Sequence, residues 1–112
     1  MQIEGITFVG TRTAARSEMA SFVRDVLGLT PAHVEGMEAD LFDLPDDTSF
    51  AVTSGGDERT VGFLVADIDA AAAELRAAGV VTDDDVAGND RYRYLHFRAP
   101  DGRLYELVER RT

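Results

Sequence analysis

The stretch that decides the fold lies near the C-terminus and reads Ala99-Pro100-Asp101-Gly102-Arg103-Leu104-Tyr105-Glu106-Leu107. Its first four residues are typical of a tight turn, because Pro fixes φ and Gly accepts a left-handed backbone. The remaining residues predict a β-strand with one carboxylate between two large apolar side chains. Side chains alternate along a strand, so Glu106 is expected to share a face with Leu104 and Val108, while Tyr105 and Leu107 face the helices.

An earlier stretch predicts a strand that runs into a helix, and it reads Val61-Gly62-Phe63-Leu64-Val65-Ala66-Asp67-Ile68-Asp69. Asp67 or Asp69 can cap the helix by accepting a hydrogen bond from a free backbone N–H. Gly79 can end the helix in the left-handed conformation. The helix has apolar residues at helical spacing, namely Ile68, Ala71, Ala72, Leu75 and Ala78.

The first half of the chain repeats this order. A strand over residues 6–9 precedes a helix over 17–27, which Gly28 can end. Each helix is followed by three short segments with strand composition, at residues 32–37, 39–44 and 49–53 and at residues 80–82, 92–98 and 104–109. Turns are expected at residues 45–47, 87–90 and 100–102, and a join between the halves at 54–57. A unit this small cannot bury its own apolar face, so the two copies are expected to pair.

The strand-to-helix stretch, the helix end Ala77-Ala78-Gly79-Val80 and the C-terminal turn together resemble the second module of the vicinal-oxygen-chelate superfamily, which includes glyoxalase, bleomycin-resistance and extradiol-dioxygenase proteins. The resemblance covers nearly the whole chain. It implies an α+β fold in which two tandem βαβββ modules pair into a curved, incomplete mixed β-barrel with helices outside. It also implies one domain over residues 1–112, with module one at about residues 1–54 and module two at about 58–110.

The resemblance further implies four metal-ligand positions, on the first and last strands of each module. In this chain they fall on Phe8, Ala51, Thr60 and Glu106. Phe and Ala cannot coordinate a metal and Thr is a poor neutral ligand, so only Glu106 keeps a ligand type. We therefore expect no metal and no other cofactor. The alternative is a divalent metal held by a new set, such as His96 and Glu106 with one further donor.

Glu106 and His96 are the two candidates for a catalytic role. Glu106 can anchor a cationic or hydrogen-bond-donating ligand or act as a base; otherwise an arginine neutralises it, such as Arg12, Arg98 or Arg103. His96 is either an acid–base partner or a strand histidine with satisfied hydrogen bonds. It shares a strand face with Tyr92, Tyr94 and Arg98, and the sequence leaves open which way that face points. The residues expected at the ligand are Phe8, Arg12, Ala51, Thr60, Gly62, Leu64, His96, Leu104 and Glu106.

Other polar groups are expected to serve only the surface. His33 lies on a predicted outer strand. The run Asp83-Asp84-Asp85 lacks the spacing and the bidentate Glu of a calcium loop, so a solvated acidic loop is expected there.

Composition narrows the class of partner. The 112 residues carry a formal net charge of −10 and no cysteine. This charge disfavours nucleic acid and anionic membrane, which require clustered Lys and Arg. No signal peptide or membrane span is visible, so a cytoplasmic protein is expected. The symmetry of the repeat favours a homodimer, whose modules pair within one chain or exchange between two.

These observations favour a metal-free protein of the glyoxalase/bleomycin-resistance type that binds a small molecule in the concave sheet and is not an enzyme. Two alternatives stay open. One is a metal-dependent lyase or dioxygenase of the same superfamily, which requires a ligand set other than the expected one. The other is a metal-free acid–base isomerase that uses Glu106 as the base and His96 or a tyrosine as the acid.

Overall fold

The computed structural model describes residues 1–55 and 57–112. Gly56, in the predicted join, lies outside the described residues. The described residues form one eight-stranded sheet and two helices, in the order strand, helix, three strands, twice over. The first half contains β1 (Gly5–Arg12), α1 (Arg16–Asp25), β2 (Thr30–Ala32), β3 (Asp40–Asp43) and β4 (Ser49–Thr53). The second half contains β5 (Arg59–Leu64), α2 (Ile68–Ala77), β6 (Ala87–Gly88), β7 (Tyr92–Arg98) and β8 (Leu104–Arg110).

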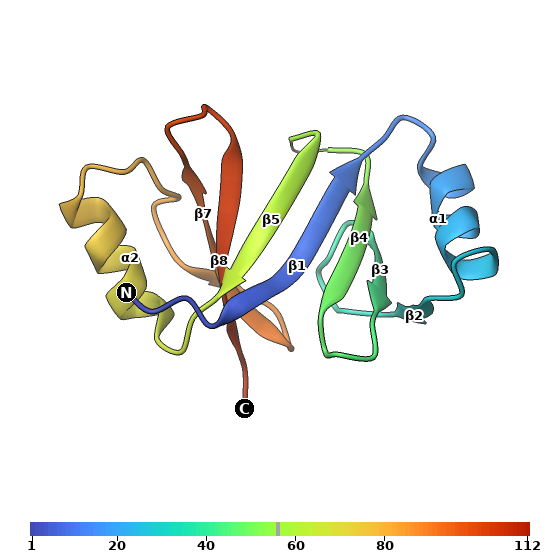
Figure 1. Cartoon of the computed structure of the whole chain (residues 1–112), viewed down its shortest axis with the longest axis horizontal. Coiled ribbons are helices and arrows are strands. Elements are labelled where there is room, and N and C mark those ends of the chain that lie inside the picture. The colour runs from blue at the N-terminus through green and yellow to red at the C-terminus, as the bar shows by residue number, and fades with distance from the viewer. Residues whose placement is uncertain (56) are drawn as a thin grey trace.

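The sheet is built by joining the two halves through their first strands. Its strand order is β2-β3-β4-β1-β5-β8-β7-β6. Within each half the first strand runs parallel to the last, β1 with β4 and β5 with β8. Between the halves β1 and β5 run antiparallel, with Val9 opposite Val61. The predicted α+β fold of two βαβββ units in a curved, incomplete barrel is confirmed, and the units pair within one chain (Figure 1).

Both helices cover the convex face of the sheet, one over each half (Figure 1). The side chain of Asp67 caps α2 by accepting a hydrogen bond from the backbone N–H of Ala70, 3.1 Å away. Gly28 follows α1 and Gly79 follows α2, with φ of 72° and 78°. These are left-handed values that a residue with a Cβ adopts only with strain.

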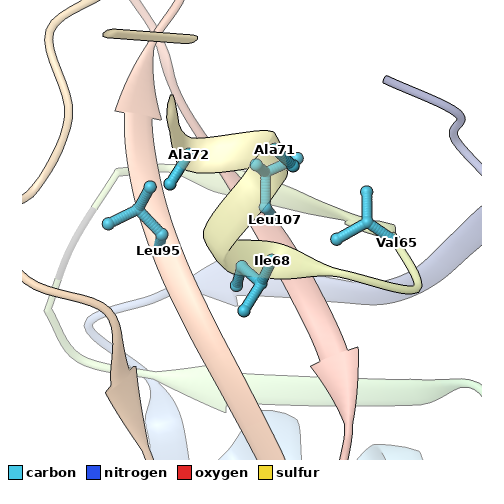
Figure 2. Packing of buried hydrophobic residues seen from close by; sticks show 6 residues of the cluster. All are labelled: Val65, Ile68, Ala71, Ala72, Leu95 and Leu107. Atoms are coloured by element: carbon cyan, nitrogen blue, oxygen red, sulfur yellow. The ribbon is translucent and has the colours of Figure 1, made fainter. Parts of the chain in front are cut away.

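The larger apolar core lies between α2 and the strands beneath it. Ile68, Ala71 and Ala72 of the helix pack with Leu95 of β7 and Leu107 of β8 (Figure 2). Leu95 and Leu107 are at most 1% exposed. The predicted alternation along β8 is therefore confirmed for Leu107, and the opposite side chains of β7 and β8 are left to the concave face.

Three predicted segments differ from the structure. Residues 32–37 were expected to form a strand, but β2 ends at Ala32 and the chain turns at Gly36, whose φ of 79° is incompatible with a strand. Residues 80–82 form only one isolated bridge, between Thr82 and Phe97. The expected turn at 87–90 begins with the two-residue strand β6.

Neither described helix is long and apolar enough to cross a membrane, since each has ten residues.

Candidate functional site

The concave face of the sheet holds a cavity of about 250 Å³. Its walls come from both halves of the chain. Strands β1 and β5 contribute Phe8, Gly10 and Thr60, and the loop before β3 contributes Met37, Glu38 and Ala39. Strands β7 and β8 contribute Tyr92, Tyr94, His96, Leu104, Glu106 and Val108. The face of β7 that the sequence left unassigned thus points into the cavity.

A row of four residues that lie side by side on neighbouring strands brings Glu106 and His96 together in the cavity. Phe8 of β1 lies opposite Gly62 of β5, Gly62 opposite Glu106 of β8, and Glu106 opposite His96 of β7. A Cβ added at Gly62 would lie 2.9 Å from Cβ of Phe8 and 3.0 Å from Cγ2 of Val108. The row therefore requires glycine at Gly62, because a larger residue would displace the side chains on both sides of it.

Phe8 fills the space beside the row. Its ring lies over Gly10, where an added Cβ would be 3.2 Å from the ring carbons Cε1 and Cζ. Phe8 also packs against the buried cluster of Val34, Leu41 and Ala51. The cavity wall formed by β1 is thus an aromatic surface.

His96 is held between two carboxylates. Its Nε2 lies 2.9 Å from Oε2 of Glu106, and its Nδ1 lies 2.9 Å from Oδ2 of Asp83. Asp83 is fixed in turn, because the same Oδ2 accepts a hydrogen bond from the backbone N–H of His96. The side chain of Glu106 is 12% exposed and that of His96 is 29% exposed. Asp83, His96 and Glu106 form a charged row that we call the carboxylate–histidine chain.

This arrangement keeps His96 protonated. Hydrogen bonding to Glu106 first, and then to Asp83, raises the pKa of His96 to about 9, against the opposing effect of burial. A positively charged imidazole donates from both nitrogens, which matches a carboxylate on each side. At neutral pH His96 is therefore a cation. The carboxylate–histidine chain then has two carboxylates for one positive charge.

Further contacts between the halves fix the aromatic wall. The hydroxyl groups of Tyr92 and Ser49 are hydrogen-bonded at 3.1 Å. The neighbouring Arg91 makes an ion pair of 3.1 Å with Asp43 and lies over the Tyr92 ring, 5.3 Å from its centroid. Tyr92 therefore enters the cavity with both its ring and its hydroxyl group engaged.

Comparison with solved structures identifies this architecture. Methylmalonyl-CoA epimerase from Mycobacterium tuberculosis superposes with a TM-score of 0.78 at 20% identity, over 98% of this chain and 90% of the other. The chain has the fold of the vicinal-oxygen-chelate superfamily. A Streptomyces coelicolor methylmalonyl-CoA epimerase in complex with 2-nitronate-propionyl-CoA gives a TM-score of 0.72 at 20% identity, over 96% of this chain and 98% of the other.

A glyoxalase/bleomycin resistance protein/dioxygenase superfamily member from Vibrio splendidus is also similar. Its TM-score is 0.67 at 17% identity, and the match covers 93% of this chain and 97% of the other. Comparison of the sequence with protein-family models gives no match, and neither does comparison with curated proteins.

The residues of this chain do not fit the metal site that the vicinal-oxygen-chelate resemblance implies. The strand register places Ala51 and Thr60 beside Gly10, and Phe8 and Glu106 beside Gly62. Only Glu106 offers a ligand atom suited to a divalent ion. His96 cannot complete the set, since a carboxylate engages each of its nitrogens. Over residues 1–55 and 57–112, no three His, Asp or Glu side chains are placed to hold an ion.

Five of the residues expected at the ligand line the cavity: Phe8, Thr60, His96, Leu104 and Glu106. The other four lie outside the cavity lining. Alternation along a strand predicts which face a side chain is on, but not whether a neighbouring side chain covers it or whether the cavity extends that far along the strand. Ala51 is fully buried in the cluster against which Phe8 packs, and Gly62 lies beneath Phe8 and Val108. Arg12 lies at the exposed end of β1, and Leu64 lies at the end of β5 beyond Gly62.

Glu106 forms its ion pair with His96. Of the three arginines suggested as alternatives, Arg98 has other partners. Arg98 donates instead to Oδ2 of Asp57 and to the backbone oxygen of Gly102. Asp57 also accepts a hydrogen bond of 2.7 Å from the backbone N–H of Leu104. This pairing neutralises Asp57 at the edge of the cavity.

Sequence reasoning missed Asp83 and the loop at residues 36–39. Asp83 was interpreted as part of a solvated acidic loop, but residues 81–83 run along the edge of β7, with backbone hydrogen bonds from Arg98 to Val81 and from Asp83 to His96. The strand-like composition of residues 80–82 could have indicated the position of Asp83. A segment that pairs with the edge of β7 at these residues brings the next residue, Asp83, beside His96. The loop was missed because residues 32–37 were predicted as a strand.

We expect Gly62→Ala to destabilise the protein by about 1–3 kcal/mol, because the new Cβ displaces Phe8 or Val108. Chemical unfolding measures the difference. Gly55→Ala is the matched control, since its added Cβ meets nothing within 4 Å, and its effect should stay within about 0.5 kcal/mol. Equal effects of the two substitutions would contradict the close packing at Gly62.

We expect the stability of the protein to fall as the pH rises through about 9, the pKa of His96 in the folded state. The unfolded value is 6.5, so the contribution of His96 is fully present below about pH 6.5 and is lost above about pH 9. Unfolding free energies measured across this range should fall in the natural chain and vary less in His96→Asn. NMR titration of the ring should give a lower midpoint in Glu106→Gln. An unchanged midpoint in that variant would contradict the pairing of His96 with Glu106.

Proposed function

We propose that this chain is a metal-free binding protein that holds a small organic molecule in the concave cavity. The observation that carries the proposal is the combination of apolar walls with one oriented carboxylate. Phe8, Leu104 and Val108 supply apolar surface around Glu106, whose position is fixed by His96. Small-molecule sites in proteins have this composition, with apolar walls and a few placed polar groups.

The donor chemistry supports binding without a metal. A divalent ion requires several nitrogen or oxygen donors that converge on one point. Two of the four expected positions are Phe8 and Ala51, and the Phe8 ring occupies space beside Gly10. The nearest additional donor, His96, is engaged on both nitrogens. Binding energy therefore has to come from burial, aromatic contact and the Glu106 carboxylate.

Structures with the same fold support an organic ligand of low molecular mass. One methylmalonyl-CoA epimerase is in complex with methylmalonyl-CoA and NH4+, and the Streptomyces coelicolor protein is in complex with 2-nitronate-propionyl-CoA. We propose a ligand without the CoA group. No Lys or Arg is among the described residues that line its cavity, whereas phosphate groups are usually bound by such cations.

Proton transfer is the second candidate function, and the carboxylate–histidine chain favours it. Glu106 lies beside the His96 cation and could take a proton from a carbon or heteroatom of a substrate and return it. His96 would orient the carboxylate throughout. In this reading the protein is an isomerase, and Glu106→Gln abolishes turnover while a substrate still binds.

A fragment screen tests the binding proposal. Chelator-treated protein is exposed to a mixed library of neutral, cationic and anionic fragments, and binding is detected by ligand-observed NMR. We expect hits that Thr60→Trp eliminates, because the indole fills the cavity from β5.

Val81→Trp is the matched control for the screen. Val81 is 72% exposed and lies outside the cavity lining, so the hits should persist in this variant. Circular dichroism confirms that both variants are folded. The proposal fails when no fragment binds, or when Thr60→Trp leaves all hits in place.

A further inference from the structure

We infer that the ligand is a small organic cation, a protonated amine with an apolar body, whose ammonium group binds Glu106. This inference rests on the proposed binding function and specifies its ligand class. It depends on four features of the cavity: its charge, the second oxygen of Glu106, its aromatic wall and its volume.

The charge of the cavity excludes most anions. The carboxylates that line it are Glu38, Asp57 and Glu106, and His96 is the one cationic side chain among the described lining residues. Arg98 neutralises Asp57, and His96 is shared between Asp83 and Glu106. Negative charge is therefore left over in the carboxylate–histidine chain and at Glu38. The formal net charge of −10 adds a field that attracts cations to the cavity.

The second oxygen of Glu106 is available to a ligand. Oε2 is paired with His96, whereas no described residue donates a hydrogen bond to Oε1. Oε1 lies 3.5 Å from the position of an added Cβ at Gly62, on the concave side of the sheet. Every buried side-chain oxygen of the described residues has a hydrogen-bond partner. Because Oε1 has none, it is not buried, and it opens to the cavity that Glu106 lines. An ammonium group binds such an oxygen through a charge-assisted hydrogen bond, which is roughly twice as strong as a bond between neutral groups.

Three aromatic side chains share the cavity with Glu106. Phe8, Tyr92 and Tyr94 line the same cavity as Glu106. Ring faces attract organic cations within about 6 Å of their centroid. Phe8 lies opposite Gly62, which lies opposite Glu106, so the strand register brings an aromatic side chain to the row that holds the carboxylate. This pairing favours an organic ammonium over a metal ion.

The volume of the cavity limits the size of the ligand. At about 250 Å³ it is smaller than the ~300–1,000 Å³ of drug-sized sites, which favours an amine with a single ring. Met37, Leu104 and Val108 offer apolar contact to the body of such a molecule. The probe we choose is 2-phenylethylammonium.

Calorimetric titration of three molecules of similar size tests the charge preference. The probes are 2-phenylethylammonium, 2-phenylethanol and 3-phenylpropanoate, titrated into the natural chain near neutral pH. We expect the ammonium to bind at least about tenfold more tightly than the alcohol, and the carboxylate to bind most weakly. Glu106→Gln should reduce the affinity for the ammonium to that for the alcohol.

Glu18→Gln is the matched control because it removes the same charge from the exposed surface of α1. It should keep the preference for the ammonium. The inference is overturned when the alcohol or the carboxylate binds as tightly as the ammonium, when Glu18→Gln weakens ammonium binding as much as Glu106→Gln, or when none of the three probes binds.

The fragment screen separates this failure from failure of the proposed function. Neutral or anionic fragments, but no cationic ones, could bind to the natural chain and be lost in Thr60→Trp. That result would overturn the inference of a cationic ligand and would still support the proposed binding function. A screen without any cavity hit would overturn both.

Discussion

The antiparallel pairing of β1 with β5 is the constraint on which the rest of the structure depends. Each half contributes only part of the cavity: Phe8 and the loop at residues 36–39 come from the first, His96 and Glu106 from the second. The pairing sets Phe8 opposite Gly62, and Gly62 sets the position of Glu106. A shift of one residue in this register would turn Phe8 to the convex face and separate the aromatic wall from the carboxylate.

Much of the fold could be predicted because local patterns determine it. The apolar stripe of α2, its Asp67 cap and the turn before β8 need no long-range information. Alternation along β8 also placed Leu104 and Glu106 on the concave face. The partner of Glu106 could not be predicted, because it depends on the register of β7 against β8 and on which face of β7 is concave. Asp83 depends on how an irregular segment docks on a sheet edge, and the composition of an acidic run does not encode this.

The cavity contains partly buried charged side chains, whose removal from water costs free energy. Glu106 is 12% exposed, and its desolvation is offset by the His96 cation next to it. Asp83 supports that cation from the other side of the ring, at a more exposed position. One carboxylate is thus held in an apolar wall by its ion pair with His96, and one of its oxygens is left for a ligand. In the proposed function this ordered carboxylate supplies the directional contact, and the rings of Phe8 and Tyr94 supply the surface around it.

A crystal structure of the natural chain with 2-phenylethylammonium tests the central claim most directly. We predict that the ammonium nitrogen lies about 2.7–3.2 Å from Oε1 of Glu106, with the phenyl ring in the cavity and the His96–Glu106 contact intact. A ligand outside the concave cavity would contradict the claim. So would an ammonium group placed away from Glu106, or a Glu106 carboxylate that has left His96.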